Sequence, residues 1–211
     1  MAGEFALTLQ LLQQILGTLS GPALTAANAV LAQGSLLPTQ LAALGLPVTA
    51  MKTRLHGYFH LGQVLIVGSD VMLTGFGSGP AEGLQARRTK GSPLQDVAGL
   101  LCSLDNAAAA ALSKLTAERP EDLKTLEPLV RSWSGIARDA FMAGYRESIA
   151  GCPIWPADPG AAERLLALFC LERIVQELQD ALTNRPEWVQ VSLERLLELM
   201  MARVGDDVPV T

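Results

Sequence analysis

The chain has 211 residues, of which 49% are hydrophobic and 18% charged, with a formal net charge of −5 and a mean hydropathy of +0.28. This composition excludes an intrinsically disordered chain, which combines low hydropathy with high net charge, and the acidic balance argues against a general nucleic-acid-binding protein. Three scattered cysteines, Cys102, Cys152 and Cys170, offer neither a disulfide framework nor a zinc site, so we expect reduced thiols in a cytoplasmic protein.

Membrane and export signals are absent from the sequence pattern. No run reaches the ~18 consecutive apolar residues of a membrane-spanning helix. No Lys or Arg precedes Lys52, so a basic leader segment is missing as well. We therefore predict no membrane association.

The segment from Phe5 to Met51 contains no charged residue and no histidine. Its apolar spacing predicts a first helix that ends near Gly17, a second from Pro22 to about Gly34, and a short third one over Pro38–Ala43. The first helix carries two apolar stripes. One consists of Phe5, Leu9, Leu12, Leu16 and Leu19, and the other of Leu7, Leu11 and Ile15.

Exposed helix faces usually carry charge, and these helices carry none. Two explanations stay open: the helices are buried against the rest of the chain, or another chain covers them. The stripe of Leu7, Leu11 and Ile15 is the predicted contact surface for a protein partner or for self-association as a homo-oligomer.

The middle of the chain changes character. Residues 64–67 and 71–74 are short apolar runs joined by Gly68-Ser69-Asp70, which predicts a β-hairpin. A glycine-rich loop, Gly75–Pro80, and basic residues at 87, 88 and 90 follow. Ser92 and Pro93 then suit the start of a helix that continues to Leu112.

The last hundred residues predict helices over Leu123–Ala150, Ala161–Leu182 and Ser192–Arg203. In the first of these, helical spacing places Trp133, Ile136, Phe141 and Tyr145 in the core. The sequence thus predicts one mainly α-helical domain over 1–211. It would consist of an uncharged helical segment (1–51), a helical body with a small hairpin (52–204) and a tail (205–211).

Residues His56–Leu65 read His-Gly-Tyr-Phe-His-Leu-Gly-Gln-Val-Leu. This segment resembles the catalytic loop of bacterial maltokinases, His-Gly-Asp-Tyr-His-Leu-Gly-Gln-Val-Leu, in a family related to the aminoglycoside phosphotransferases. Residues 87–99 and 184–189 resemble two later motifs of that family, so the resemblance covers about Arg54 to Leu199. It implies the helical C-terminal lobe of a protein-kinase-like fold. The N-terminal lobe would be absent, because only 55 residues precede His56.

Several functional positions of the maltokinase pattern differ in this chain. Tyr58 stands where the resemblance places the catalytic Asp, and Gly75 stands where it places the metal-binding Asp. Gly77 and Gly79 replace two neighbouring glutamates, and Gln63 alone survives from the metal ligands. A tyrosine has an ordinary pKa near 10 and is a poor base at neutral pH. We therefore predict no catalytic residue, no bound metal and no cofactor.

Other positions of the pattern are retained or partly retained. The resemblance places sugar contacts at positions that here are Arg173 and Glu177, and His60 remains a further candidate. It also implies that Asp96 braces the catalytic loop by accepting backbone N–H bonds. The alternative for Asp96 is an acidic residue that the helix dipole favours in a first turn.

The resulting hypothesis is a catalytically inactive, maltokinase-like interaction module in trehalose, maltose and glycogen metabolism, which contacts trehalose synthase or itself. One alternative is a module that binds a sugar or nucleotide without turnover. Another is residual maltokinase activity.

Overall fold

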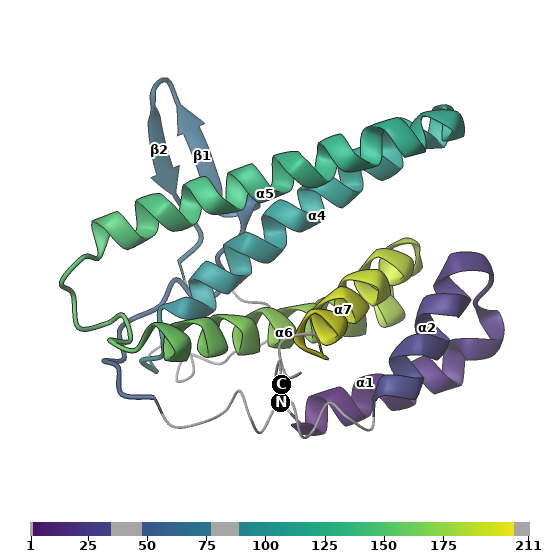
Figure 1. The fold of residues 1–211 in the computed structure, drawn as a ribbon, viewed down its shortest axis with the longest axis horizontal. Coiled ribbons are helices and arrows are strands. Elements are labelled where there is room, and N and C mark those ends of the chain that lie inside the picture. The colour runs from purple at the N-terminus through teal and green to yellow at the C-terminus, as the bar shows by residue number, and fades with distance from the viewer. Residues whose placement is uncertain (1, 35–47, 77–88, 205–211) are drawn as a thin grey trace, which may run out of the picture. The chain divides into compact units, whose positions relative to one another are not determined.

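The structure is a computed structural model, and it describes residues 2–34, 48–76 and 89–204. It is mainly helical, with one small antiparallel sheet, which confirms the mainly α-helical class with a hairpin (Figure 1). The chain divides into two compact units. The terminal unit comprises Met1–Pro47 and Ala167–Thr211, and the central unit comprises Val48–Leu166.

The terminal unit contains helices α1 (Ala2–Ile15), α2 (Gly21–Gln33) and α7 (Val189–Val204), together with the C-terminal part of α6 (Pro159–Asn184). Short 3-10 turns, η1 (Leu16–Thr18) and η5 (Pro186–Trp188), follow α1 and precede α7. Helix α2 packs on α7 (Figure 1). The buried side chains of these two helices are Ala26, Ala27, Val30, Val189, Leu193, Leu196 and Met200.

Helix α1 buries the face that carries Phe5, Thr8 and Leu12. The Thr8 hydroxyl donates to the Glu4 carbonyl at 2.8 Å. On α6, the Gln179 amide donates to the Thr8 hydroxyl at 2.8 Å and to the Glu4 carbonyl at 3.0 Å. The two hydrogen bonds from Gln179 fix the rotation of α1 about its axis, because the buried Thr8 hydroxyl needs its hydrogen-bond partners.

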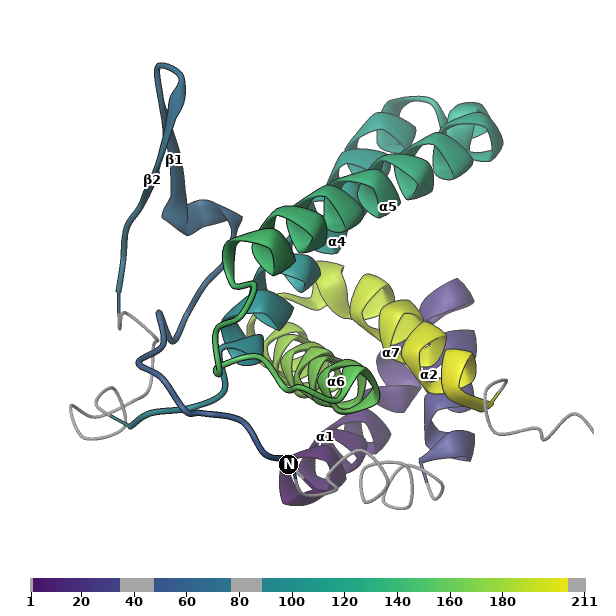
Figure 2. The ribbon, with the colours of Figure 1, turned by 60° about the vertical axis from the view of Figure 1, so that its left-hand side comes forward.

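The central unit is built on α4 (Leu94–Glu118) and α5 (Leu123–Ser148), which η4 (Pro120–Asp122) joins and which lie side by side in both views (Figures 1 and 2). A polar contact fixes their pairing. The Asp105 carboxylate of α4 accepts from the Ser134 hydroxyl at 2.7 Å and forms an ion pair with Arg138, both on α5.

The hairpin consists of β1 (Val64–Val67) and β2 (Asp70–Leu73), paired antiparallel with Val64 opposite Leu73 and Val67 opposite Asp70. It projects away from α4 and α5 in both views (Figures 1 and 2). Strand β2 begins and ends one residue earlier than the expected strand at 71–74. Upstream, η2 (Leu61–Gln63) leads into β1.

The expected helices are present, with ends that differ by a few residues. Helix α4 continues to Glu118, past the predicted end at Leu112, because the alanine-rich stretch after Asn106 favours helix. Helix α5 contains Pro128 near its start. The predicted helix over Pro38–Ala43, the positions Gly77, Gly79, Arg87 and Arg88, and the tail 205–211 lie outside the described residues.

The expected core of α5 is partly wrong. Trp133 and Ile136 are exposed, whereas Ser134 on the neighbouring face is buried. The reason is the ion pair and hydrogen bond to Asp105, which turn the Ser134 and Arg138 face of α5 toward α4. Apolar spacing alone does not reveal such a polar contact.

Within the described part of the chain, no helix combines the length and the apolar character that crossing a membrane requires.

Candidate functional site

The loop over residues 56–63 in the central unit contains three of the predicted site positions, Tyr58, His60 and Gln63. Its first two backbone N–H groups, those of His56 and Gly57, donate to the two oxygens of the Asp96 carboxylate at 2.7 and 2.9 Å. Asp96 lies in the first turn of α4. Bonds from N–H groups to an ionised carboxylate are among the stronger hydrogen bonds in proteins. The start of α4 therefore holds the start of the loop.

The buried imidazole of His56 connects this loop to the end of β2. Its Nε2 lies 2.7 Å from the Thr74 carbonyl oxygen, and its Nδ1 lies 3.4 Å from the Tyr58 backbone nitrogen. A carbonyl can only accept, so Nε2 carries the proton and Nδ1 accepts from Tyr58. The ring also lies against Phe59 and Phe76, at centroid distances of 5.2 and 4.7 Å. His56 is thus a framework residue of the loop.

The second half of the loop is held in a similar way. The Nδ1 atom of His60 accepts from the Gly62 N–H at 3.1 Å, which caps η2. The Leu61 N–H donates to the Ser103 hydroxyl of α4 at 3.0 Å. The Tyr58 ring meets the His60 ring edge-on at 4.9 Å. The Tyr58 and His60 rings therefore lie together.

Gln63 and Gly75 lie next to each other. The Thr74 N–H donates to the Gln63 carbonyl at 2.9 Å, and the Thr74 hydroxyl donates to the Gln63 side-chain Oε1 at 3.2 Å. Gly75 has φ of +72°, and a Cβ there would overlap Gln63 Oε1. The missing side chain at position 75 leaves room for the Gln63 amide.

The loop and hairpin do not fit a magnesium site on their own. Mg²⁺ beside nucleotide phosphates is held by one or two carboxylates. Between His56 and Phe76 the only carboxylate is that of Asp70, at the hairpin turn. No group of three His, Cys, Asp or Glu side chains that could hold a metal occurs among the described residues. The Gln63 amide is the one predicted ligand that remains there.

Tyr145 on α5 lies in the electrostatic field of Asp96. Burial raises the pKa of the Tyr145 phenol, and the Asp96 and Cys152 charges raise it further. The Tyr145 ring also contacts Phe141 and Trp155, at centroid distances of 6.0 and 5.9 Å. Tyr145 thus stays a neutral hydrogen-bonding group at neutral pH.

A second polar group lies in the terminal unit, where α6 faces α7. Glu177 is paired with Arg173 at 3.1 Å and with Arg195 of α7 at 3.2 Å. The side chains of Glu177 and Arg195 are only 13% and 11% exposed. Glu177 thus lies between two guanidinium groups, which define this Glu177 group, and each of its carboxylate oxygens can accept a further hydrogen bond.

The structure thus brings together some predicted residues and adds others. Arg173 and Glu177 are adjacent on α6, whereas His60 belongs to the central unit. Sequence reasoning missed Arg195, Ser103 and Thr74. Ser103 and Thr74 follow from no residue type or spacing. The one sequence signal for Arg195 is that it is a cation on the helix that follows the motif at residues 184–189.

The fold is similar to that of solved glucosamine kinases. Several solved structures match nearly the whole chain, including the following two. One is a glucosamine kinase in complex with glucosamine, ADP and inorganic phosphate, with a TM-score of 0.68, 23% identity, and coverage of 97% of this chain and 48% of that chain. The other is a glucosamine kinase in crystal form A, with a TM-score of 0.70, 24% identity, and coverage of 97% and 47%.

The curated relatives are glucosamine kinases as well. The enzyme of Streptacidiphilus jiangxiensis is 27% identical over 151 residues, which cover 72% of this chain and 32% of the relative. The enzyme of Mycolicibacterium smegmatis is 29% identical over 150 residues, which cover 70% of this chain and 33% of the relative. No protein-family signature matches the chain. The chain thus spans about a third of the curated relatives and about half of the solved chains.

These similarities correct the maltokinase interpretation. The relatives are named glucosamine kinases, so the assignment to maltokinases and to trehalose, maltose and glycogen metabolism is wrong. The prediction of an inactive scaffolding module is also wrong, because the similar proteins are enzymes. The prediction of inactivity rests on a comparison of Tyr58 and Gly75 with the two Asp positions of the maltokinase pattern, and that pattern is not the right reference. The shared motifs shape a loop, and they do not identify the sugar or measure activity.

Proposed function

We propose that this chain forms the helical, C-terminal-lobe half of a sugar kinase similar to the glucosamine kinases. The observation that carries the proposal is the match of 97% of the chain to solved glucosamine kinases, supported by two curated relatives of the same name. The proposal keeps the cytoplasmic location predicted from the composition.

In this proposal the loop over residues 56–63 faces the sugar hydroxyl that receives the phosphoryl group. Catalysis of phosphoryl transfer depends mainly on positioning and on charge stabilisation. The bonds from His56 and Gly57 to Asp96, and from Leu61 to Ser103, support a rigid loop of this kind. Asp96 acts here as a positioning residue.

Within the terminal unit taken by itself, the Glu177 group is the proposed sugar-binding group. Guanidinium groups donate hydrogen bonds and carboxylates accept them, so the group can bind neighbouring sugar hydroxyls from both sides. Its low exposure favours binding, because hydrogen bonds strengthen where water is excluded.

The test measures glucosamine binding to the full chain by calorimetry and by the shift in melting temperature. A ligand at 100 times its Kd stabilises the folded state by about 2.7 kcal/mol. We expect glucosamine to raise the melting temperature more than maltose does. Glu177→Gln should weaken glucosamine binding at least ~10-fold, since it removes a charged hydrogen-bond acceptor.

Glu194→Gln is the matched control, because Glu194 is an exposed carboxylate of α7 in the same unit. It should bind glucosamine like the unmodified chain. Phosphate transfer from MgATP to glucosamine, followed by mass spectrometry of the sugar, tests the reaction itself. If glucosamine neither binds nor is phosphorylated, the proposal is wrong.

A further inference from the structure

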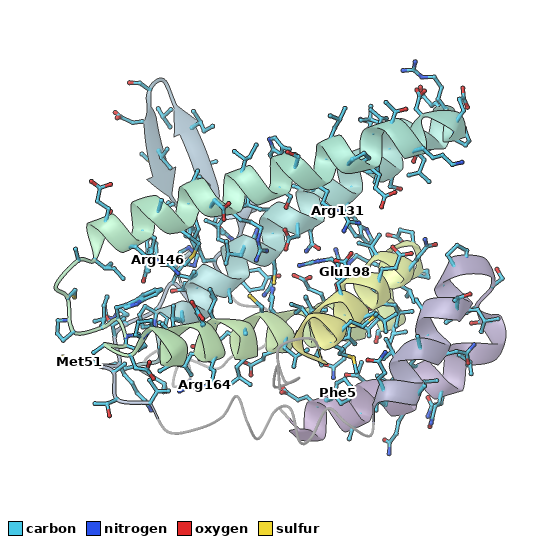
Figure 3. All side chains as sticks on the ribbon, viewed as in Figure 1. Phe5, Met51, Arg131, Arg146, Arg164 and Glu198 are labelled. Carbon is cyan, nitrogen blue, oxygen red and sulfur yellow. The ribbon has the colours of Figure 1, made fainter. Side chains whose placement is uncertain are left out.

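Helix α5 carries a row of exposed apolar side chains, which we call the α5 stripe. Its members are Leu129, Trp133, Ile136, Ala140 and Ala143. The first three are 62%, 50% and 68% exposed. Ser134 and Arg138, which bond to α4, lie on the opposite side of the helix. Arg131 and Arg146, both labelled in Figure 3, show where this stretch of α5 lies.

The spacing of the α5 stripe is that of a coiled-coil seam. Its members follow one another in steps of four, three, four and three residues, the repeat by which one helix packs along another. The outer face of a helix is usually polar, and contiguous exposed apolar side chains mark interaction surfaces. Tryptophan is also enriched among the residues that anchor interfaces. The stripe therefore fits a second helix.

The side-chain volumes along the stripe are unequal. Leu129 and Trp133 are large and lie in its first half, whereas Ala140 and Ala143 are small and lie in its second half. Beside the two alanines, Gly144 leaves open space, because no heavy atom lies within 4 Å of where its Cβ would stand. The second half of the stripe thus offers room for large side chains such as those of the first half.

This inequality makes the stripe complementary to itself when two copies of α5 run antiparallel. Each large half then packs on the small half of the other copy, and Ile136 lies near the two-fold axis. In a parallel pair, Trp133 would face Trp133 and Ala140 would face Ala140, which crowds one end and leaves a gap at the other. An antiparallel pair also closes as a symmetric dimer.

The polar residues beside the stripe agree with this arrangement. Ser132 and Asp139 are exposed and lie seven residues apart in one row next to the stripe. Antiparallel pairing about Ile136 brings the Ser132 hydroxyl of each copy opposite the Asp139 carboxylate of the other. A hydroxyl can donate to a carboxylate, and the two Asp139 side chains stay apart. No like charges therefore meet along this row.

The size of the surface indicates the strength of the contact. Two stripes that cover each other bury on the order of 1,000 Å² in total over both chains, which is the lower end for a specific interface. We therefore expect a dimer that dissociates on dilution through the micromolar range.

We infer that α5 is a self-association surface, which pairs antiparallel with α5 of a second copy of this chain through the α5 stripe. The inference goes beyond the proposed function and is independent of it, because neither the loop over residues 56–63 nor the Glu177 group takes part.

Sedimentation equilibrium of the full chain over the micromolar range tests the inference. We expect a monomer–dimer equilibrium. Ile136→Asp places a charge at the centre of the pair and should weaken dimerisation at least ~30-fold, the effect typical of a central interface residue. Ile66→Asp is the matched control, since Ile66 is 80% exposed on the hairpin in the same unit, and it should dimerise like the unmodified chain. Circular dichroism melting shows that each variant is folded.

Cross-linking tests the orientation, in a Cys152→Ala background that removes the exposed native thiol. One chain carries Ser132→Cys and another carries Asp139→Cys. On mild oxidation the mixture should form a disulfide-linked dimer, and neither chain should do so alone. A parallel pair gives the reverse result, because each cysteine then faces its own copy and lies too far from the other for a disulfide.

Four results would overturn the inference. A chain that stays monomeric over the whole range has no such surface, and a dimer that Ile136→Asp leaves intact uses another one. A dimer that Ile66→Asp or Leu7→Asp dissociates is formed by the hairpin or by α1. A dimer whose mixed cysteine chains do not cross-link is not antiparallel.

Discussion

The Asp96 carboxylate joins the loop to α4, and its charge acts on Tyr145 of α5. It accepts two consecutive loop N–H groups, and its charge contributes to the raised pKa of Tyr145. The raised pKa means that the folded chain holds the Tyr145 proton more tightly than the unfolded chain does. The free energy of unfolding therefore falls as the pH rises from about 10 through the folded-state pKa.

Asp96→Asn should lower the free energy of unfolding by about 1–3 kcal/mol, because an amide offers one acceptor oxygen where two N–H groups point. Urea denaturation measures this change. The same variant should lower the pKa of Tyr145, which absorbance at 295 nm follows directly in a Tyr58→Phe background, since the chain has only two tyrosines.

Asp139→Asn, an exposed position of α5, is the control for charge loss and should change the stability by less than about 0.5 kcal/mol. If Asp96→Asn is as stable as this control, the two N–H bonds do not hold the loop.

At the scale of elements, α1 shows which of its two apolar stripes is buried. Phe5 and Leu12 of the first stripe are buried, whereas Leu7 of the second is 50% exposed and Leu11 and Ile15 are half-buried. The polar bonds from Gln179 to Thr8 and Glu4 lie on the same side as the first stripe. Self-association through the Leu7, Leu11 and Ile15 stripe stays a prediction.

Leu12→Ala should lower the free energy of unfolding by about 2–5 kcal/mol, because it leaves a cavity in the core of the terminal unit. Leu7→Ala removes the same atoms from an exposed position and should cost less than about 1 kcal/mol. Urea denaturation of both variants gives the comparison. Similar losses for the two would mean that the second stripe is buried as deeply as the first.

The sequence predicted the positions of the helices and of the hairpin better than it predicted which face of each helix is buried. Periodicity and helix-start signals identified α1, α2, α4, α5, α6 and α7 and the hairpin, because these signals are local. The rotation of α5 depends on the contact of Asp105 with Ser134 and Arg138. These two residues follow Asp105 by 29 and 33 residues along the chain. No local pattern carries such information, so Trp133 and Ile136 were placed in the core incorrectly.

The candidate site shows the same division. The loop motif and the later motif at residues 87–99 singled out His56, Gln63 and Asp96. In the fold, Asp96 accepts from the His56 N–H, and Thr74 bonds to both His56 and Gln63. The sequence did not predict that Arg195 is a partner of Glu177, because the two residues lie on different helices. The identity of the sugar could not be read from the loop, because the residues that shape a loop differ from those that select a substrate.

At the scale of the whole molecule, each unit contains a buried cysteine that can report its opening. Cys102 lies in the core of the central unit and Cys170 in that of the terminal unit, while Cys152 is exposed. A thiol reagent should label Cys152 immediately. Relative to the unfolded chain, Cys102 and Cys170 should react at least ~100-fold more slowly, because labelling requires local or global opening.

Variants that keep a single cysteine, with the other two replaced by alanine, follow each unit separately as urea is added. The chain in 6 M guanidinium chloride is the control and should show all three thiols, as counted from the sequence. Because α6 runs without interruption from the central unit into the terminal one, melting of this helix in one unit should extend into the other. We therefore expect Cys102 and Cys170 to become reactive over the same range of urea. Labelling of Cys170 well before Cys102 would show that the terminal unit opens independently of the central one.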